Sequence, residues 1–140
     1  ATRKELVVRL EFYDTGFKHC YVARAQTGEL AHLQWLIYPD ENDIIRSQFK
    51  NRFYALKEKQ VMVENAFTFP KYRGLGLVQS VTYELLQKAK AKGSRAAVCY
   101  ILKSNTESIN QFVSLGFKIT ELLREVKFLR MTKRSLKAQT

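Results

Sequence analysis

Hydrophobic positions along the chain follow two different periods, which predict a mixture of strands and helices. Residues 5–13 fit either element, because their apolar positions alternate as in a strand and also recur at helical spacing. We favour a helix, since Thr2 can cap its start and Asp14-Thr15-Gly16 can end it. The runs 17–24 and 30–38 are strand-like, and the residues between them have turn chemistry, so they predict an antiparallel hairpin.

The middle of the chain carries an amphipathic stripe followed by a buried strand. Apolar residues recur every three or four positions from 42 to 57, which predicts one helix capped by Asn42 or Asp43. Residues 61–69 predict a strand that ends at Pro70, because proline cannot donate to a continuing ladder. The polar face of the expected helix is basic, a pattern typical of a solvated surface, and consists of Arg46, Lys50, Arg52 and Lys57.

The second half of the chain predicts a crossover unit and a closing region. Residues 77–92 predict a helix and 95–102 a short apolar strand, so strand, glycine turn, helix and strand follow in the order that joins parallel neighbours. Ser104-Asn105-Thr106-Glu107 has the pattern of a capping box, which opens a helix through residue 115. Residues 117–123 and 125–131 predict two closing strands.

The size and composition of the chain fit one folded domain. Its 140 residues, 46% of them apolar, can fill a hydrophobic core, and the order of elements predicts the α/β (α+β) class with a mixed sheet. No apolar run approaches the roughly 20 residues of a membrane span, so we expect no membrane partner. The absent initiator methionine suggests a processed or excised segment. The expected parts are 1–16, 17–38, 60–92, 95–131 and a basic tail over 132–140.

Cysteine and histidine are sparse and isolated. Cys20 and Cys99 are 79 positions apart among apolar neighbours, which indicates buried thiols in a reducing, cytoplasmic setting rather than a disulfide. We assign structural roles to His19 and His32, because neither has a second ligand at metal spacing. We therefore expect no metal.

Charge is the unusual bulk property. The 24 basic and 13 acidic residues give a net charge of +11, which favours an anionic partner. A nucleic acid, a membrane surface and a polyphosphate cofactor all carry the required sign. Net charge alone does not choose among them.

A glycine-rich loop lies between the strand 61–69 and the helix 77–92. Gly74 and Gly76 let the backbone turn tightly and approach a ligand, and the first turn of the helix then offers unpaired N–H groups to a phosphate. Arg73 adds a full positive charge beside them. The loop lacks the lysine of a Walker motif and the third glycine of a dinucleotide fingerprint.

Two separated motifs resemble the GNAT superfamily of acyl-CoA-dependent N-acyltransferases. FTFPKYRGLGL, residues 67–77, is similar to the family's strand, proline and pyrophosphate loop, and NTESINQFVSLGF, residues 105–117, is similar to its late helix. The resemblance extends from Cys20 to about Met131. It implies the GNAT fold, with a mixed central sheet splayed at an acyl-CoA cleft and an N-terminal part that is shortened or truncated.

The resemblance also implies a cofactor site for acetyl-CoA or another acyl-CoA. Residues 65–69 would line the pantetheine, and N–H groups around Phe67 and Thr68 would polarise the thioester carbonyl. Residues 73–78 would hold the pyrophosphate. The implied cofactor-binding residues are Phe67, Thr68, Phe69, Arg73, Gly74, Leu75, Gly76, Leu77, Val78, Asn105, Ser108 and Phe112.

Three positions depart from the family pattern. Val78 replaces the third glycine of the loop, and Lys71 stands where glutamine or arginine is usual. Phe112 occupies the late-helix position where many members carry a tyrosine that protonates the leaving thiolate. Ser108, Tyr100 or a water could supply that proton, or the thiolate could leave without an acid.

Glu64 is the candidate general base, because it interrupts an otherwise apolar strand. Its carboxylate is either desolvated beside the cleft, with a raised pKa, or paired with a cation and purely structural. Glu11 and Asp43 are weaker candidates.

Trp35 and Tyr38 either shape an acceptor pocket or pack in the core, and we assign Cys99 to the core rather than to nucleophilic catalysis.

These observations favour an N-acyltransferase that moves an acetyl group from acetyl-CoA to a primary amine by direct attack. The acceptor would be an amine-bearing small molecule, protein or peptide, and the resemblance adds a homodimer as a candidate assembly. One alternative is an inactive acyl-CoA-binding regulatory module, suggested by Phe112 and by the short N-terminal part. Another is a basic nucleic-acid-binding protein, which we do not favour because no recognition motif accompanies the charge.

Overall fold

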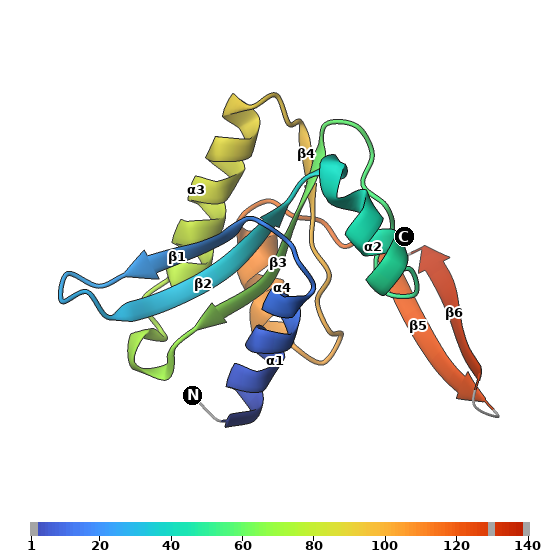
Figure 1. The fold of residues 1–140 in the computed structure, drawn as a ribbon, viewed down its shortest axis with the longest axis horizontal. Helices are drawn as coiled ribbons and strands as arrows, with labels where there is room; N and C mark the ends of the chain where they lie inside the picture. The colour runs from blue at the N-terminus through green and yellow to red at the C-terminus, as the bar shows by residue number, and fades with distance from the viewer. Residues whose placement is uncertain (1–2, 129–130, 139–140) are drawn as a thin grey trace.

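A mixed four-stranded sheet forms the centre of the protein (Figure 1). The computed structural model describes the backbone of residues 3–128 and 131–138 and the side chains of residues 3–123. Strands β1 (Cys20–Arg24), β2 (Leu30–Ile37), β3 (Gln60–Thr68) and β4 (Ala96–Val98) lie in sequence order. The pairs β1–β2 and β2–β3 are antiparallel and β3–β4 is parallel, which confirms the predicted hairpin and crossover.

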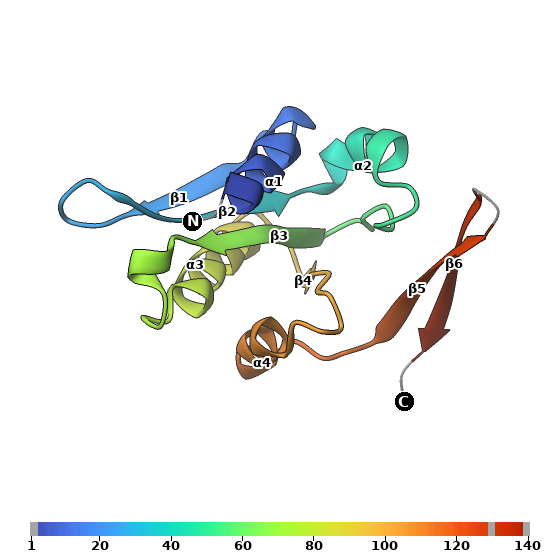
Figure 2. The same ribbon diagram turned by 90° about the horizontal axis from the view of Figure 1, so that it is seen from below.

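Helices cover both faces of this sheet. α1 (Arg3–Asp14) and α2 (Asn42–Gln48) lie on one face, and α3 (Leu77–Ala91) and α4 (Thr106–Ser114) lie on the other (Figure 2). The predicted mixed sheet flanked by helices is therefore confirmed. In the described part of the chain, no helix is long and apolar enough to cross a membrane.

Each face has its own hydrophobic core. The core under α1 and α2 is aromatic, and the Phe12 ring packs 4.8 Å from Trp35 and 5.7 Å from Phe49, measured between centroids. The core under α3 and α4 is mainly aliphatic and consists of Leu36, Val61, Val63, Leu85, Ala89 and Phe112. Phe12 is the buried residue of α1, so the helix favoured for residues 5–13 is confirmed and is anchored through this ring.

The single helix expected over 42–57 is wrong, because α2 ends at Gln48. The Asn42 side chain caps no helix: its amide donates to the Leu56 carbonyl at 2.9 Å and accepts from the Leu56 N–H at 2.7 Å. This clamp folds the following residues back in turns, with the Phe49 and Phe53 rings stacked 5.0 Å apart. The helical spacing arose because the turns and the helix bury residues in one core.

The C-terminal region also differs from its prediction. β4 has three residues rather than the expected 95–102, because its pairing with β3 ends at Val98. The closing strands run over β5 (Glu121–Phe128) and β6 (Met131–Ala138), not 117–123 and 125–131, so most of the expected basic tail is a strand. β5 and β6 pair as a separate two-stranded sheet that lies away from the central one (Figure 1). Backbone pairing extends these strands beyond the apolar alternation that suggested their limits.

Candidate active site

An irregularity in β3 marks the start of the candidate site. Leu33 lies opposite Phe67 and Trp35 lies opposite Glu64, so three steps along β3 match two along β2. The extra residue makes a β-bulge, and Asn65 within it has a φ of 55°. Because the bulge interrupts the alternation of side chains, Glu64 and Phe67 share the face covered by α1.

Strands β3 and β4 separate next to this bulge. Their pairing ends at Met62 and Val98, after which β3 continues to Thr68 paired with β2 only. The separation agrees with the splayed sheet expected from the resemblance. A cavity of about 1330 Å³ lies at this point, and its walls include Phe49, Phe53, Glu64, Asn65, Cys99 and Tyr100.

Glu64 is a half-buried carboxyl group on the wall of this cavity. Burial raises its pKa to about 7, and the backbone amides of Asn65 and Tyr100 and the charges of Arg52 and Arg9 oppose that rise. Its Oε2 is shielded from solvent and has no hydrogen-bond partner among the described residues. The group therefore changes protonation near neutral pH, as a general base in this cavity must.

Asn65 adds a second buried acceptor on the wall of the same cavity. Its Oδ1 is also buried and unpaired within the described part of the chain. Two buried acceptor oxygens without donors are costly, and a ligand that carries N–H groups supplies donors of the kind that they lack. Glu11, a weaker candidate, also lines the cavity, whereas Asp43 is exposed and pairs with Arg46 at 3.7 Å.

The positive charges of two arginine side chains, Arg52 and Arg9, act on Glu64. Arg52 lines the cavity, and Arg9 of α1 places its guanidinium 4.7 Å from the centroid of the Phe67 ring. Burial lowers the pKa of Arg9, and Glu5 and Glu64 raise it in part. The group stays cationic because an arginine pKa lies far above neutrality.

Tyr100 brings a phenol into the same cavity. Its hydroxyl oxygen accepts the Tyr54 N–H at 3.0 Å, and its ring packs 4.8 Å from Phe53. Burial raises the pKa of Tyr100, and the Glu64 carboxylate raises it further, so the phenol keeps its proton at neutral pH. Its O–H can therefore donate a proton or hydrogen bond there.

Thr68 presents its backbone to the gap between the strands. The Phe69 N–H donates to the Ala31 carbonyl at 2.9 Å, so the alternation of an antiparallel ladder directs the Phe67 N–H toward β2 and the Thr68 N–H away from it. The Thr68 carbonyl, on the open side, accepts Arg73 Nε at 2.8 Å. Of the two amides predicted to contact pantetheine, Thr68 is the one aimed at the cleft.

The loop after β3 has the backbone expected of a phosphate cradle. A 3-10 turn over Pro70–Tyr72 leads to Gly74, with a φ of 80°, and to Gly76, with a φ of 74°, which is the N-cap of α3. A Cβ at either glycine would meet open space within 4 Å. The first intrahelical bond joins the Ser80 N–H to the Gly76 carbonyl, so the N–H groups of residues 77–79 precede the helical ladder and point out of its N-terminus.

Arg73 lies between this loop and α1. Besides its bond to Thr68, it contacts Glu5 at 3.5 Å and lies 5.5 Å from the Phe67 ring centroid. Lys71, one of the departures from the family pattern, pairs with Glu29 at 2.8 Å, and Tyr72 also donates to Glu29. The loop is therefore braced against α1 and against the β1–β2 turn.

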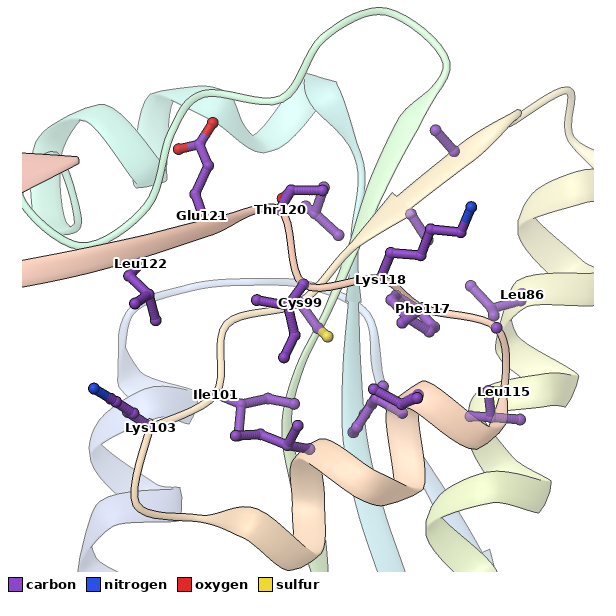
Figure 3. Close-up of a pocket in the computed structure, with 18 residues that line it drawn as sticks. Leu86, Cys99, Ile101, Lys103, Leu115, Phe117, Lys118, Thr120, Glu121 and Leu122 are labelled. Atoms are coloured by element: carbon purple, nitrogen blue, oxygen red, sulfur yellow. The ribbon is translucent and has the colours of Figure 1, made fainter. Parts of the chain in front are cut away.

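The late helix presents its predicted residues in different ways. Asn105 is its N-cap and accepts the Ser108 N–H at 3.2 Å, while Phe112 is buried in the core under α3. Phe112 also lines a second, largely apolar cavity of about 600 Å³ between α4, β4 and residues 117–122 (Figure 3). Cys99 and Ile101 border both cavities.

Other candidate residues have structural surroundings. Burial raises the pKa of Cys99 to about 12, so its thiol is protonated near neutrality and is a poor nucleophile. Trp35 is buried in the aromatic core, and His32 is buried in the sheet. Among residues with described side chains, no group of three or more His, Cys, Asp or Glu is arranged to hold a metal ion.

Sequence reasoning missed the parts of the site that depend on three-dimensional contacts. It did not anticipate the bulge at Asn65 or the approach of Arg9 to Phe67. It placed Arg52 on a solvated helix face without a binding role, although the residue lines the cavity. The available signal in the sequence was an asparagine within a strand-like run, because asparagine tolerates the left-handed backbone region that a bulge uses.

Solved acetyltransferase structures share this fold. YycN of Bacillus subtilis, a provisionally assigned acetyltransferase, superposes with a TM-score of 0.61 at 16% identity, over 89% of this chain and 74% of that one. A GNAT superfamily phosphinothricin acetyltransferase of Sinorhizobium meliloti, solved with AcCoA, gives 0.56 at 21% identity, over 89% of this chain and 60% of that one. A provisionally assigned phosphinothricin N-acetyltransferase superposes with a TM-score of 0.59 at 20% identity, over 94% of this chain and 79% of that one.

These likenesses establish the class of fold. The chain has the fold of the GNAT acetyltransferases, which confirms at that level the resemblance carried by its two motifs. Neither a protein-family model nor a curated protein matches the chain.

Proposed function

We propose that this protein is an N-acyltransferase that transfers an acetyl group from acetyl-CoA to a primary amine. The observation that carries the proposal is the pair of buried, unpartnered oxygens of Glu64 and Asn65 on the wall of a cavity at the splayed strands, counted over the described residues. An amine supplies the donors that these oxygens lack. The GNAT fold supports acyl-CoA as the second substrate.

The loop before α3 suits the diphosphate of CoA. Positive φ at Gly74 and Gly76 turns the backbone, and the space beside both glycines leaves room for a ligand. The N–H groups at the start of α3 and the positive end of its dipole favour an anion there. Arg73 adds charge at the same loop.

The chemistry then follows from the groups around the cavity. Glu64, deprotonated above a pKa of about 7, takes a proton from the bound ammonium, and the free amine attacks the thioester carbonyl carbon. The Thr68 N–H, directed into the gap, stabilises the negative charge that develops on the carbonyl oxygen. The C–S bond breaks and the attacking nitrogen gives its second proton to water, so that a neutral amide and a thiolate are released.

Tyr100 is our candidate for protonating that thiolate. Its phenol keeps its proton at neutral pH and lines the cavity with Glu64. Ser108, the alternative from sequence, does not line this cavity. The position of Tyr100 beside the cavity favours it over Ser108.

Calorimetric titration with acetyl-CoA and with CoA tests the cofactor site. Arg73→Glu should weaken both by at least about tenfold, because it reverses a charge beside the diphosphate. Arg95→Glu makes the same charge change at an exposed residue before β4 and should leave both affinities unchanged. Equal affinities for wild type and Arg73→Glu would contradict the assignment of this loop.

Turnover over a panel of primary amines tests the enzyme. Release of CoA with one or more amines, slowed about a hundredfold by Glu64→Gln, is the expected result. Tight acetyl-CoA binding without transfer to any amine would instead favour the inactive acyl-CoA-binding module. The observation that favours this second function is the buried Phe112, which stands where many GNAT proteins carry a tyrosine acid.

A further inference from the structure

A continuous chain of polar side chains runs through the apolar core between β2 and α3. Thr68 Oγ1 lies 2.7 Å from His32 Nδ1, and His32 Nε2 lies 3.0 Å from Gln34 Oε1. Gln34 Nε2 then donates to Thr82 Oγ1 at 2.9 Å. His32, Gln34 and Thr82 are fully buried.

The chemistry of the four groups gives this chain one direction. Since Gln34 donates to Thr82 with its amide nitrogen, its oxygen accepts the proton of His32 Nε2. Burial lowers the pKa of His32, so the ring is neutral and its Nδ1 accepts from the Thr68 hydroxyl. The Thr68 side chain is therefore held as a donor in one orientation.

The two ends of the chain belong to the two halves of the proposed cofactor site. Thr68 ends β3 and directs its N–H into the gap where the thioester would lie. Thr82 lies in the second turn of α3, whose N-terminus follows the glycine loop. Apolar side chains of the same shape would pack without the cost of burying polar groups, whereas hydrogen bonds add fixed distances and directions.

We propose that His32 and Gln34 are positioning residues, which hold the Thr68 N–H at a set distance from the N-terminus of α3 so that one acyl-CoA engages both at once. This inference rests on the proposed function, because it assumes that acyl-CoA binds across these elements. It assigns the residues no contact with the substrate. Their effect passes through the backbone of Thr68.

Two ligands separate the two ends of the site. 3′-Phospho-ADP, the nucleotide end of CoA, reports on the glycine loop, and acetyl-CoA reports on the loop and on β3 together. Thr68→Val removes the hydroxyl but keeps the backbone N–H, and Thr68→Ser keeps both. Both substitutions are measured beside His32→Leu and beside Leu85→Ala, a buried control in the same core that lies outside the polar chain.

We expect Thr68→Val and His32→Leu to lower the ratio of acetyl-CoA affinity to nucleotide affinity by about fivefold or more, with nucleotide affinity unchanged. The double variant should lose no more than either single variant, because both break one chain. Thr68→Ser should restore the ratio, and Leu85→Ala should leave it unchanged although it destabilises the fold. If His32→Leu does not fold, the valine and serine variants decide the question.

Turnover distinguishes this inference from the proposed function. In an active enzyme, kcat should fall about tenfold in Thr68→Val and recover in Thr68→Ser. A wild type that binds acetyl-CoA but transfers nothing would refute the enzyme, while the affinity ratio would still decide the inference. The positioning role would be overturned if Thr68→Val kept the wild-type ratio of acetyl-CoA affinity to nucleotide affinity, or if Leu85→Ala lowered that ratio equally. Failure of the wild type to bind acetyl-CoA would overturn both the positioning role and the proposed function.

Discussion

Replacing Glu64 with glutamine should stabilise the folded protein above neutral pH while it slows acyl transfer. In the folded state, burial raises the pKa of this carboxyl group from 4.5 to about 7. A group whose pKa is higher in the folded state contributes stability below its unfolded pKa and loses that contribution as pH rises through the folded value. Glutamine does not titrate, so its variant escapes the loss.

The size of the effect follows from the same two values. The interval from 4.5 to about 7, at about 1.4 kcal/mol for each pH unit, amounts to about 3 kcal/mol as an upper limit. The difference in free energy of unfolding, variant minus wild type, should therefore rise between pH 4.5 and about 7 and become constant above it. Every other titrating group is common to both proteins and cancels in this difference.

Urea unfolding of both proteins at several pH values from 5 to 8.5 measures the difference. Glu84→Gln, at an exposed position of α3, is the matched control for loss of one carboxyl group. In parallel, wild-type kcat/KM should fall as pH drops below about 7, and the Glu64→Gln variant should lack that limb. A stability difference that does not grow with pH would refute the buried, titrating carboxyl group.

Three further predictions concern the loop, the turn after α2 and the acid. Gly76→Ala should lower the free energy of unfolding by about 1 kcal/mol and weaken acetyl-CoA binding, because alanine is strained at a φ of 74°; calorimetry with undiminished affinity would contradict it. Asn42→Ala should cost about 2 kcal/mol in urea unfolding, since it removes both bonds to Leu56, whereas the exposed Asn51→Ala should be neutral. Tyr100→Phe should reduce kcat about tenfold with little change in KM, and a larger loss in Ser108→Ala would reverse that assignment.

Local signals in the sequence were sufficient to predict several elements. Strand, glycine turn and helix around the phosphate loop were predicted because Pro70, Gly74 and Gly76 restrict or free the backbone where they stand. α4 could also be predicted, because Asn105 caps its start and Gly116 follows its end. These elements carry the two motifs that resemble GNAT proteins, so the class of fold could be predicted from the amino-acid sequence alone.

Contacts between distant residues determined the elements for which that local reasoning failed. The clamp of Asn42 on Leu56 ended α2 early, although the apolar spacing continued, because burial in one core does not distinguish a helix from stacked turns. The limits of β4 were likewise set by its pairing with the distant β3, and those of β5 and β6 by their pairing with each other.

The candidate site divides in the same way. Its glycine loop is a run of adjacent residues, and the sequence located it. The raised pKa of Glu64, the approach of Arg9 to Phe67 and the polar chain from Thr68 to Thr82 depend on desolvation and on distances between side chains far apart in the chain. Desolvation and such distances exist only once the elements have packed. The sequence had already proposed Glu64, Phe67 and Thr68 for the site, and the tertiary structure added the pKa shift of Glu64 and the contacts that Arg9 and the polar chain make there.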